Sequence, residues 1–236
     1  MTNDSVHAWR ANLDVGIEQL QSFMAILSAD EKQRAEQFYF SQHSQRFIVG
    51  RGLLRSILGQ YLKTDPAQLE FEYGPRGKPM LASGWGRARI QFNLSHSQGL
   101  ALYGFSLERR IGVDLEYLRP VADAEKIVQR FFSAEESAFI SRLPLQEKHQ
   151  AFYRGWTSKE AYLKATGEGL AGLEQVEVSL SPQQPACLLR INGDSQAAAR
   201  WSIQRLSPAA NYLGAIAVEG HNWQLSCWQA LPSLSY

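Results

Sequence analysis

The sequence has little cysteine, no long apolar run and almost no net charge, and each absence excludes a class of protein. The two cysteines, Cys187 and Cys227, belong to no CxxC or CxxH pattern, which argues against a disulfide framework or a zinc site. We expect both thiols to pack as small hydrophobic groups in a reducing compartment.

No segment has the length of a transmembrane helix, and the N-terminus lacks the pattern of a signal peptide. The sequence therefore predicts a soluble cytoplasmic protein without a membrane partner. The formal net charge of +1 predicts no global basic surface for nucleic acid.

What the chain contains is typical of a globular protein, with 44% hydrophobic and 20% charged residues over a length of 236. Capping boxes at "SADE" and "SAEE" mark two helix starts, at Ser28 and Ser133. Helices are expected from Ser28 toward Phe40, over 46–62, and over 152–167 up to Gly167. Within the second helix Gly50 and Gly52 are unfavourable, unless another element packs closely against them.

Alternating apolar residues predict strands over 89–97, 100–106 and 111–117, preceded by a Gly/Pro-rich loop over 72–86. Further short strands are expected between residue 176 and residue 229. The order of strand, helices and strands thus occurs twice, which indicates an α+β fold made of two similar α+β halves. We place these halves at 1–109 and 110–236.

Two acids share one face of the strand "IGVDLEY" (111–117), because Gly112, Asp114 and Glu116 alternate with apolar residues. Like charges roughly 7 Å apart along a strand repel each other. A solvated strand face is the simpler explanation when this strand is considered alone. A bound cation would relieve the repulsion, and Gly112 would let a ligand approach the backbone.

A third acid, Glu160, lies in the predicted helix "WTSKEAYLK", four residues before Lys164. The pair is compatible with an ordinary surface salt bridge. Three carboxylates on separate elements also suit Mg²⁺, which takes oxygen ligands and is often shared with substrate phosphates. The acids together favour the magnesium site.

Several basic or polar side chains lie in loops and strand ends where a phosphate could bind. "FNLSHS" ends a strand with Ser95 and His96. A hydrolase triad is not indicated here, because no acid accompanies the serine and the histidine. A local turn and a phosphate contact explain this segment equally well. Lys78 in "GPRGKP" and Arg46 are compatible with phosphate binding, although such residues are also common on solvated surfaces.

Taken in order, "RGKPML", "FNLSHS", "IGVDLEYLRP", "RFFSAEE" and "WTSKEAYLKATGEGL" resemble the motifs of the 4′-phosphopantetheinyl transferases. The resemblance is to the larger, surfactin-synthetase-activating (Sfp) type, in which two similar halves form a pseudo-dimer in one chain. It covers residues 28 to 170, and it implies an active site at the seam between the halves.

The resemblance implies a magnesium-dependent, monomeric holo-[carrier protein] synthase. Such an enzyme transfers 4′-phosphopantetheine from coenzyme A, its co-substrate, to a serine of an apo acyl- or peptidyl-carrier protein, and adenosine 3′,5′-bisphosphate leaves. The implied metal ligands are Asp114, Glu116 and Glu160, and the implied catalytic residues are Glu160, Lys164 and His96. The implied coenzyme A contacts are Arg46, Lys78, Pro79, Ser95, His96, Asp114, Lys159 and Lys164, and Arg34 matches a further basic position.

Two other functions remain compatible with the residues. A magnesium-dependent phosphohydrolase or nucleotidyl enzyme could use the same acids, and it would turn over coenzyme A without a carrier protein. A non-catalytic module that binds carrier proteins would have no need of the complete acid set. The sequence does not indicate which carrier is modified, because that choice depends on surface contacts.

Overall fold

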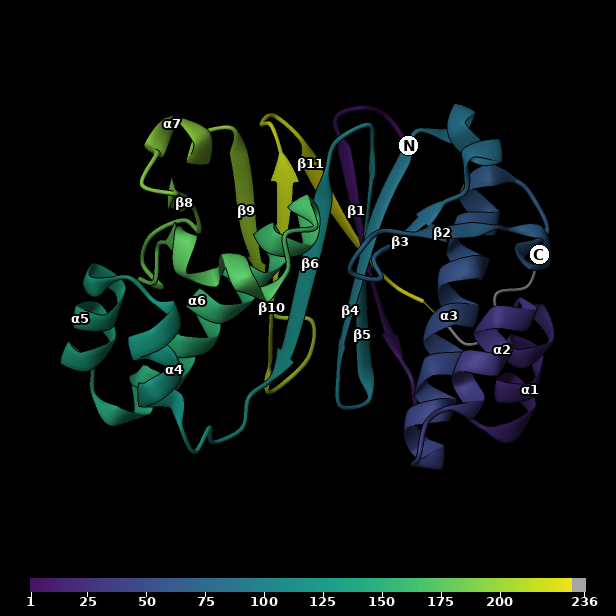
Figure 1. Ribbon diagram of the computed structural model, residues 1–236, viewed down its shortest axis with the longest axis horizontal. Coiled ribbons are helices and arrows are strands. Elements are labelled where there is room, and N and C mark those ends of the chain that lie inside the picture. The colour runs from purple at the N-terminus through teal and green to yellow at the C-terminus, as the bar shows by residue number, and fades with distance from the viewer. Residues whose placement is uncertain (231–236) are drawn as a thin grey trace.

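The computed structural model describes residues 1–230, and residues 86–88 by their backbone only. It shows an α+β fold in which two groups of helices flank a central region of strands (Figure 1). Among the described residues, no helix is long and apolar enough to cross a membrane.

The first half of the chain runs from β1 to β5. Three helices follow its first strand, and the last of these helices is the longest. The elements are β1 (Ser5–Asn12), α1 (Ile17–Ile26), α2 (Ala29–Glu36), α3 (Ser41–Leu62), β2 (Phe71–Tyr73), β3 (Pro79–Leu81), β4 (Ile90–Ser97) and β5 (Leu100–Leu107).

The second half repeats this order, with one strand, three helices, a short hairpin and antiparallel strands. Its elements are β6 (Ile111–Tyr117), α4 (Ala124–Phe131), α5 (Ala134–Arg142), α6 (Leu145–Thr166), β7 (Val176–Val178), β8 (Leu188–Ile191), α7 (Ser195–Ala198), β9 (Trp201–Leu206), β10 (Tyr212–Glu219) and β11 (Gln224–Gln229).

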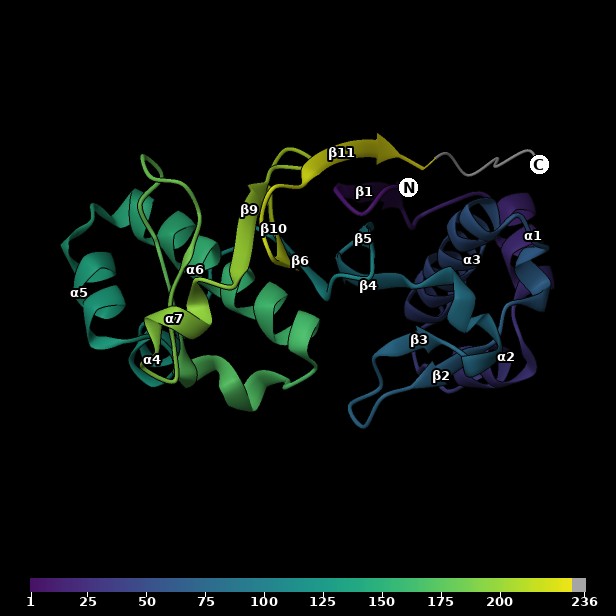
Figure 2. The same ribbon diagram turned by 90° about the horizontal axis from the view of Figure 1, so that it is seen from above.

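The two main sheets have the same topology. In one the strand order is β1-β5-β4, and in the other it is β6-β10-β9, with antiparallel neighbours throughout. The last strand departs from the repeat, because β11 returns to the first half and pairs in parallel with β1 (Figure 2). The helices α3 and α6 both span 22 residues.

Three apolar clusters hold the molecule together. One lies under the helices of each half, and the third joins β1 and β5 to β6 and β10, through residues such as Val6, Leu102 and Val113. Gly104 on β5 allows this contact, because a Cβ there would lie 2.6 Å from the Val113 side chain. The third cluster therefore fixes one half against the other.

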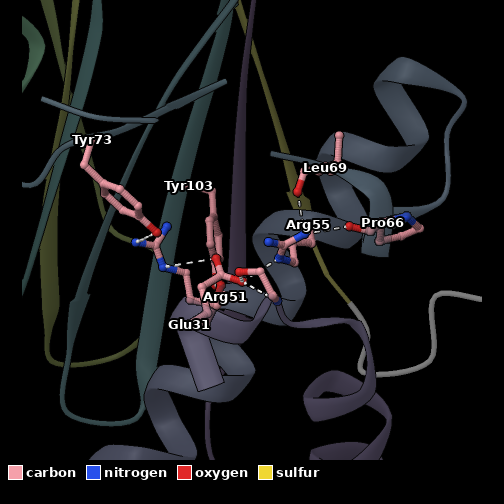
Figure 3. A network of polar contacts seen from close by, with 9 residues as sticks. Glu31, Arg51, Arg55, Pro66, Leu69, Tyr73 and Tyr103 are labelled. Atoms are coloured by element: carbon pink, nitrogen blue, oxygen red, sulfur yellow. Dashed lines mark hydrogen bonds and ion pairs between the residues drawn. The ribbon is translucent and has the colours of Figure 1, made fainter. Parts of the chain in front are cut away.

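Each capping box also carries one member of a buried ion pair. Glu31 accepts hydrogen bonds from the Ser28 backbone and hydroxyl groups, and its Oε2 lies 2.6 Å from Arg55 Nε (Figure 3). Arg55 also donates to the carbonyls of Pro66 and Leu69. Ion pairs this deeply buried need such further hydrogen bonds to offset desolvation.

The second half has the same arrangement around Glu136. Its carboxylate accepts hydrogen bonds from the Ser133 and Val178 amides, and its Oε2 lies 2.7 Å from Lys159 Nζ. Lys159 lies 14 residues after the first residue of α6, as Arg55 does in α3. The matching positions support the expectation of two similar halves.

Several sequence predictions need correction. The first helix does not run toward Phe40, because α2 ends at Glu36 and α3 begins at Ser41. The Ser44 hydroxyl donates a hydrogen bond to the Ala35 carbonyl in the last turn of α2. The loop 72–86 contains the β2–β3 hairpin. The expected packing of Gly52 is confirmed, because a Cβ there would collide with the Phe23 ring.

Other elements were not expected at all. The sequence pattern predicted neither β1 nor α1, whose positions depend on pairing and packing with distant residues. Cys187 and Cys227 are free and exposed, so the prediction that they pack inward is wrong. Cys187 lies before the short strand β8, and Cys227 lies on β11 at the edge of its sheet.

The buried pair in the first half gives a stability prediction. Arg55→Met leaves the Glu31 carboxylate buried, with Arg51 Nε at 3.9 Å as the remaining cation. The free energy of unfolding in urea should fall by about 3–5 kcal/mol, the usual cost of breaking a buried pair. The double variant Glu31→Gln/Arg55→Met removes the buried charge and should lose less than the single variant. An equal or larger loss would contradict the proposed cost of the unpaired charge.

Candidate active site

A groove of about 1220 Å³ lies between the two halves. Its walls come from α3, the β2–β3 hairpin, β4 and the C-terminal end of α6. The residues expected from the sequence that line it are Arg34, Arg46, Lys78, Pro79, Ser95, His96, Glu160 and Lys164.

Below this groove β4 lies beside β6, and side chains join the two strands. The Asn93 side-chain oxygen accepts a hydrogen bond from the Val113 amide at 2.9 Å. Further along the two strands, the Ser95 hydroxyl accepts a hydrogen bond from the Leu115 amide at 3.3 Å. The Ser97 hydroxyl accepts one from the Tyr117 amide at 3.1 Å. Polar side chains at every second residue of β4 thus take the place of the carbonyls of a neighbouring strand.

The same serines bind the two acids of β6. Ser95 Oγ donates to Asp114 Oδ1 at 3.0 Å, and Ser97 Oγ donates to Glu116 Oε2 at 3.0 Å. Asp114 is buried, and its Oδ2 has no hydrogen-bond partner among the described residues. The acid face of β6 is therefore not a solvated face.

Helix α6 covers this face and supplies the third acid. Gly112 allows the approach, because a Cβ there would collide with the Ala161 carbonyl and the Ala165 backbone. The space that the sequence assigned to a ligand at Gly112 is thus filled by the helix. One turn apart on α6, Glu160 and Lys164 are brought to the β4–β6 seam.

Lys164 forms its ion pair with Asp114 rather than with Glu160. Its ammonium lies 2.6 Å from Asp114 Oδ1 and donates to Ser95 Oγ at 2.9 Å. The surface salt bridge to Glu160, the alternative explanation for this helix, is not the contact that Lys164 makes, because its ion pair is with Asp114 of β6. Asp114 Oδ1 accepts hydrogen bonds from a serine and an ammonium at once, which fixes its side chain.

Burial and neighbouring charge make two of the acids hard to ionise. Burial, then the Asp114 and Glu116 carboxylates, raise the pKa of Glu160 to about 7, against the opposing effect of Lys164. Burial and Asp114 likewise raise the pKa of Glu116 above its usual range. The seam thus carries more negative charge than the single Lys164 ammonium balances.

Basic side chains face the groove from the first half. Arg46 makes a bidentate contact with Asp14, at 2.7 Å and 2.8 Å, which fixes its guanidinium at the groove wall. Burial, helped by the charges of Lys164 and Arg46, lowers the pKa of His96 below its usual value. His96 is therefore a neutral imidazole near pH 7.

Comparisons with known proteins agree with this geometry. The profile of the 4′-phosphopantetheinyl transferase superfamily matches residues 110–217, and that of the 4′-phosphopantetheinyl transferase N-terminal region matches residues 9–103. The 4′-phosphopantetheinyl transferase HetI of Nostoc sp. is 48% identical over 97% of this chain and 93% of its own length. The chain belongs to the 4′-phosphopantetheinyl transferase family.

The comparisons also find less similar proteins. The 4′-phosphopantetheinyl transferase Sfp of Bacillus subtilis is 28% identical over 65% of this chain and 66% of its own length. The crystal structure of Thermotoga maritima holo-[acyl-carrier-protein] synthase is similar with a TM-score of 0.36 and 21% identity, over 47% of this chain and 62% of that chain. The resemblance predicted from the ordered motifs is confirmed by the family match.

The oxygen donors of this phosphopantetheinyl transferase suit a hard cation. The Asp114 carboxylate helps to raise the pKa of both Glu116 and Glu160, and Asp114 Oδ2 is buried with no hydrogen-bond donor among the described residues. Within residues 1–230, however, no three His, Cys, Asp or Glu side chains already converge as a ligand set. The three carboxylates fit magnesium by their oxygen atoms and their charge, not by a ligand arrangement that is already assembled.

Lys159 is the implied coenzyme A contact that the structure places elsewhere. Its side chain is fully buried, and its ammonium donates to the carbonyls of Phe131 and Leu173 beside Glu136. Glu160 lines the groove, whereas Lys159, the residue before it, points into the second half. We therefore correct its expected role from ligand binding to packing within the second half.

The sequence pattern missed three polar residues that shape the site. Ser97 binds Glu116, Asn93 binds the β6 backbone, and Asp14 holds Arg46. The alternation in "FNLSHS" could have indicated the first two, since Asn93, Ser95 and Ser97 share one face of a strand. Asp14 carries no local signal, because its partner is 32 residues away.

The raised pKa of Glu160 predicts a pH-dependent stability. The folded state holds the proton more tightly than the unfolded state, so this stability is complete below the unfolded pKa of 4.5 and is lost as the pH rises through about 7. Glu160→Gln mimics the protonated acid. In chelator at pH 8 its melting temperature should exceed that of the parent by a few degrees.

The difference should shrink toward zero as the pH falls to 5. Glu168→Gln changes an exposed acid just after α6 and serves as the matched control, with no such pH-dependent gain. A Glu160→Gln gain that is the same at pH 5 and pH 8 would contradict a buried, charged Glu160.

Proposed function

We propose that this enzyme transfers 4′-phosphopantetheine from coenzyme A to a serine of an apo acyl- or peptidyl-carrier protein, and that the reaction depends on Mg²⁺. One observation carries the proposal: in a chain of this family, Asp114 pairs with the Lys164 ammonium and helps to raise the pKa of both Glu116 and Glu160, beside a groove lined with cations. A pyrophosphate with its metal ion would complete the charge balance there.

The groove side chains have distinct roles in holding coenzyme A. Arg46, oriented in advance by Asp14, presents its guanidinium to a phosphate, and Pro79 borders the wall opposite α6. His96 is neutral, so it can donate one hydrogen bond to a phosphate oxygen. Arg34 also lines the groove, with its guanidinium 5.9 Å from the Phe47 ring centre.

Asp114, Glu116 and Glu160 would hold the magnesium ion, which when bound would withdraw charge from the pyrophosphate oxygens. Lys164, held by Asp114 and Ser95, lies where it can neutralise charge on the leaving group. Little covalent chemistry is required of the protein, because phosphoryl transfer depends chiefly on positioning and charge.

The transfer balances as a displacement at phosphorus. The serine oxygen of the carrier forms a bond with the β-phosphorus of coenzyme A, and the bond from this phosphorus to the bridging oxygen breaks. Adenosine 3′,5′-bisphosphate keeps that oxygen and its electron pair. Glu160 accepts the serine proton as the general base.

The setting of the reaction is part of the same proposal. We expect the enzyme to act in the cytoplasm as a monomer, without a nucleic-acid or membrane partner. The two halves of one chain form the groove by themselves, so a second copy is not required to complete it.

The function is tested by incubating the protein with coenzyme A, Mg²⁺ and an apo-carrier, and then weighing the carrier by mass spectrometry. The carrier should gain one phosphopantetheine group, chelator should abolish the gain, and added Mg²⁺ should restore it. Cleavage of coenzyme A without a carrier would favour a phosphohydrolase instead. Full transfer in chelator would contradict the metal requirement.

Glu160→Gln separates catalysis from folding. Gln keeps the size of the side chain but cannot carry the charge that a base and a metal ligand need. The single-turnover rate of transfer should fall by at least about 10²-fold, the usual scale for losing acid–base help. Glu168→Gln should transfer at the parent rate. A folded Glu160→Gln enzyme with near-parent transfer would remove Glu160 from both roles.

A further inference from the structure

Lys78 crosses the groove and contacts the second half through its ammonium. Its Nζ donates to the carbonyl oxygens of Lys164 at 2.7 Å, Ala165 at 3.2 Å and Ile111 at 3.3 Å. Two of these carbonyls belong to the last turn of α6, where helix carbonyls have no partner within the helix. The positive charge of the ammonium is also attracted to the negative C-terminal end of the helix dipole.

The hairpin that carries Lys78 is short. Phe71 and Leu81 at its base pack against the apolar cluster of the first half, and the Tyr73 hydroxyl accepts a hydrogen bond from Arg51 at 3.4 Å. β2 and β3 pair over three residues each, from Phe71 with Leu81 to Tyr73 with Pro79. A two-stranded hairpin is at best marginally stable in water without further packing. At its base the Ser83 amide donates to Glu72, and toward its tip Lys78 makes the contact with the second half.

A second residue of the same tip also touches the second half. Gly169, in the turn after α6, has a φ of +65°, and a Cβ there would collide with the Arg76 guanidinium. Figure 2 shows the tip of the hairpin reaching toward the end of α6. The hairpin thus meets the second half at two points, the C-terminal end of α6 through Lys78 and the turn after α6 through Arg76.

We propose that Lys78 is a positioning residue, which holds the β2–β3 hairpin against the C-terminal end of α6 and so keeps this wall of the groove in place for coenzyme A. The inference rests on the proposed function for its ligand, but the contact itself is a property of the protein alone. It differs from the role that the resemblance implies for Lys78, which is a direct contact with coenzyme A.

The donors of Lys78 favour positioning over phosphate binding. An ammonium has three N–H donors, and three carbonyl acceptors already surround this one. To bind a phosphate it would have to leave the α6 carbonyls without a partner. Burial and the nearby Arg110 charge lower the pKa of Lys78 to about 8, which agrees with an enclosed ammonium.

Hydrogen exchange without coenzyme A tests the contact directly. Lys78→Met keeps the apolar stem and removes the donors. Amides in 74–78 and 167–172 should exchange about tenfold faster or more in this variant, the scale of one charge-assisted hydrogen bond. Arg46→Met removes another groove cation and should leave these amides unchanged. Unchanged exchange in Lys78→Met would overturn the inference.

The KM for coenzyme A and for 3′-dephospho-coenzyme A separates positioning from phosphate binding. A displaced wall should raise both values by a similar factor, about tenfold, in Lys78→Met. Arg46→Met should raise mainly the value for coenzyme A. An effect of Lys78→Met confined to coenzyme A would overturn positioning in favour of a 3′-phosphate contact. If the parent transfers nothing, the proposed function fails, and the exchange result still decides the role of Lys78.

Discussion

The excess of buried negative charge at the β4–β6 seam is the constraint on which the rest of the site depends. Asp114 pairs with the ammonium of Lys164 and helps to raise the pKa of both Glu116 and Glu160, and its Oδ2 is buried with no donor among the described residues. Burying carboxylates costs free energy unless they are paired or coordinate a metal. A protein that keeps such a cluster does so at the expense of stability, which is typical of active sites.

The repeated frame of the two halves explains how this cluster is held rigidly. In each half a capping-box glutamate pairs with a cation on a 22-residue helix, Glu31 with Arg55 and Glu136 with Lys159. This frame is common to both halves, but the reactive residues are not. Residues 160 and 164 of α6 are Glu and Lys, whereas the corresponding positions of α3 carry Ser56 and Gln60. The first half supplies the groove wall and its cations instead.

Sequence patterns correctly predicted the features that depend on residues close together in the chain. The strand 111–117, both capping boxes and the C-terminal cap of α6 at Gly167 follow from neighbours in sequence, and so does the shared face of Asp114 and Glu116. Long-range contacts were beyond such patterns: the partner of Lys164, the helix packed on Gly112 and the pairing of β11 with β1. Lys159 was misassigned because a motif does not indicate which side of the helix each of its residues faces.

The most direct measurement of the central claim is cation binding at the seam. Mn²⁺ can stand in for Mg²⁺ and be followed by electron paramagnetic resonance, in the presence of coenzyme A, for the parent, Glu116→Gln and the exposed control Glu168→Gln. The account predicts one bound ion per chain in the parent and the control, and a large loss of affinity in Glu116→Gln. Equal Mn²⁺ binding by the parent and Glu116→Gln would contradict it.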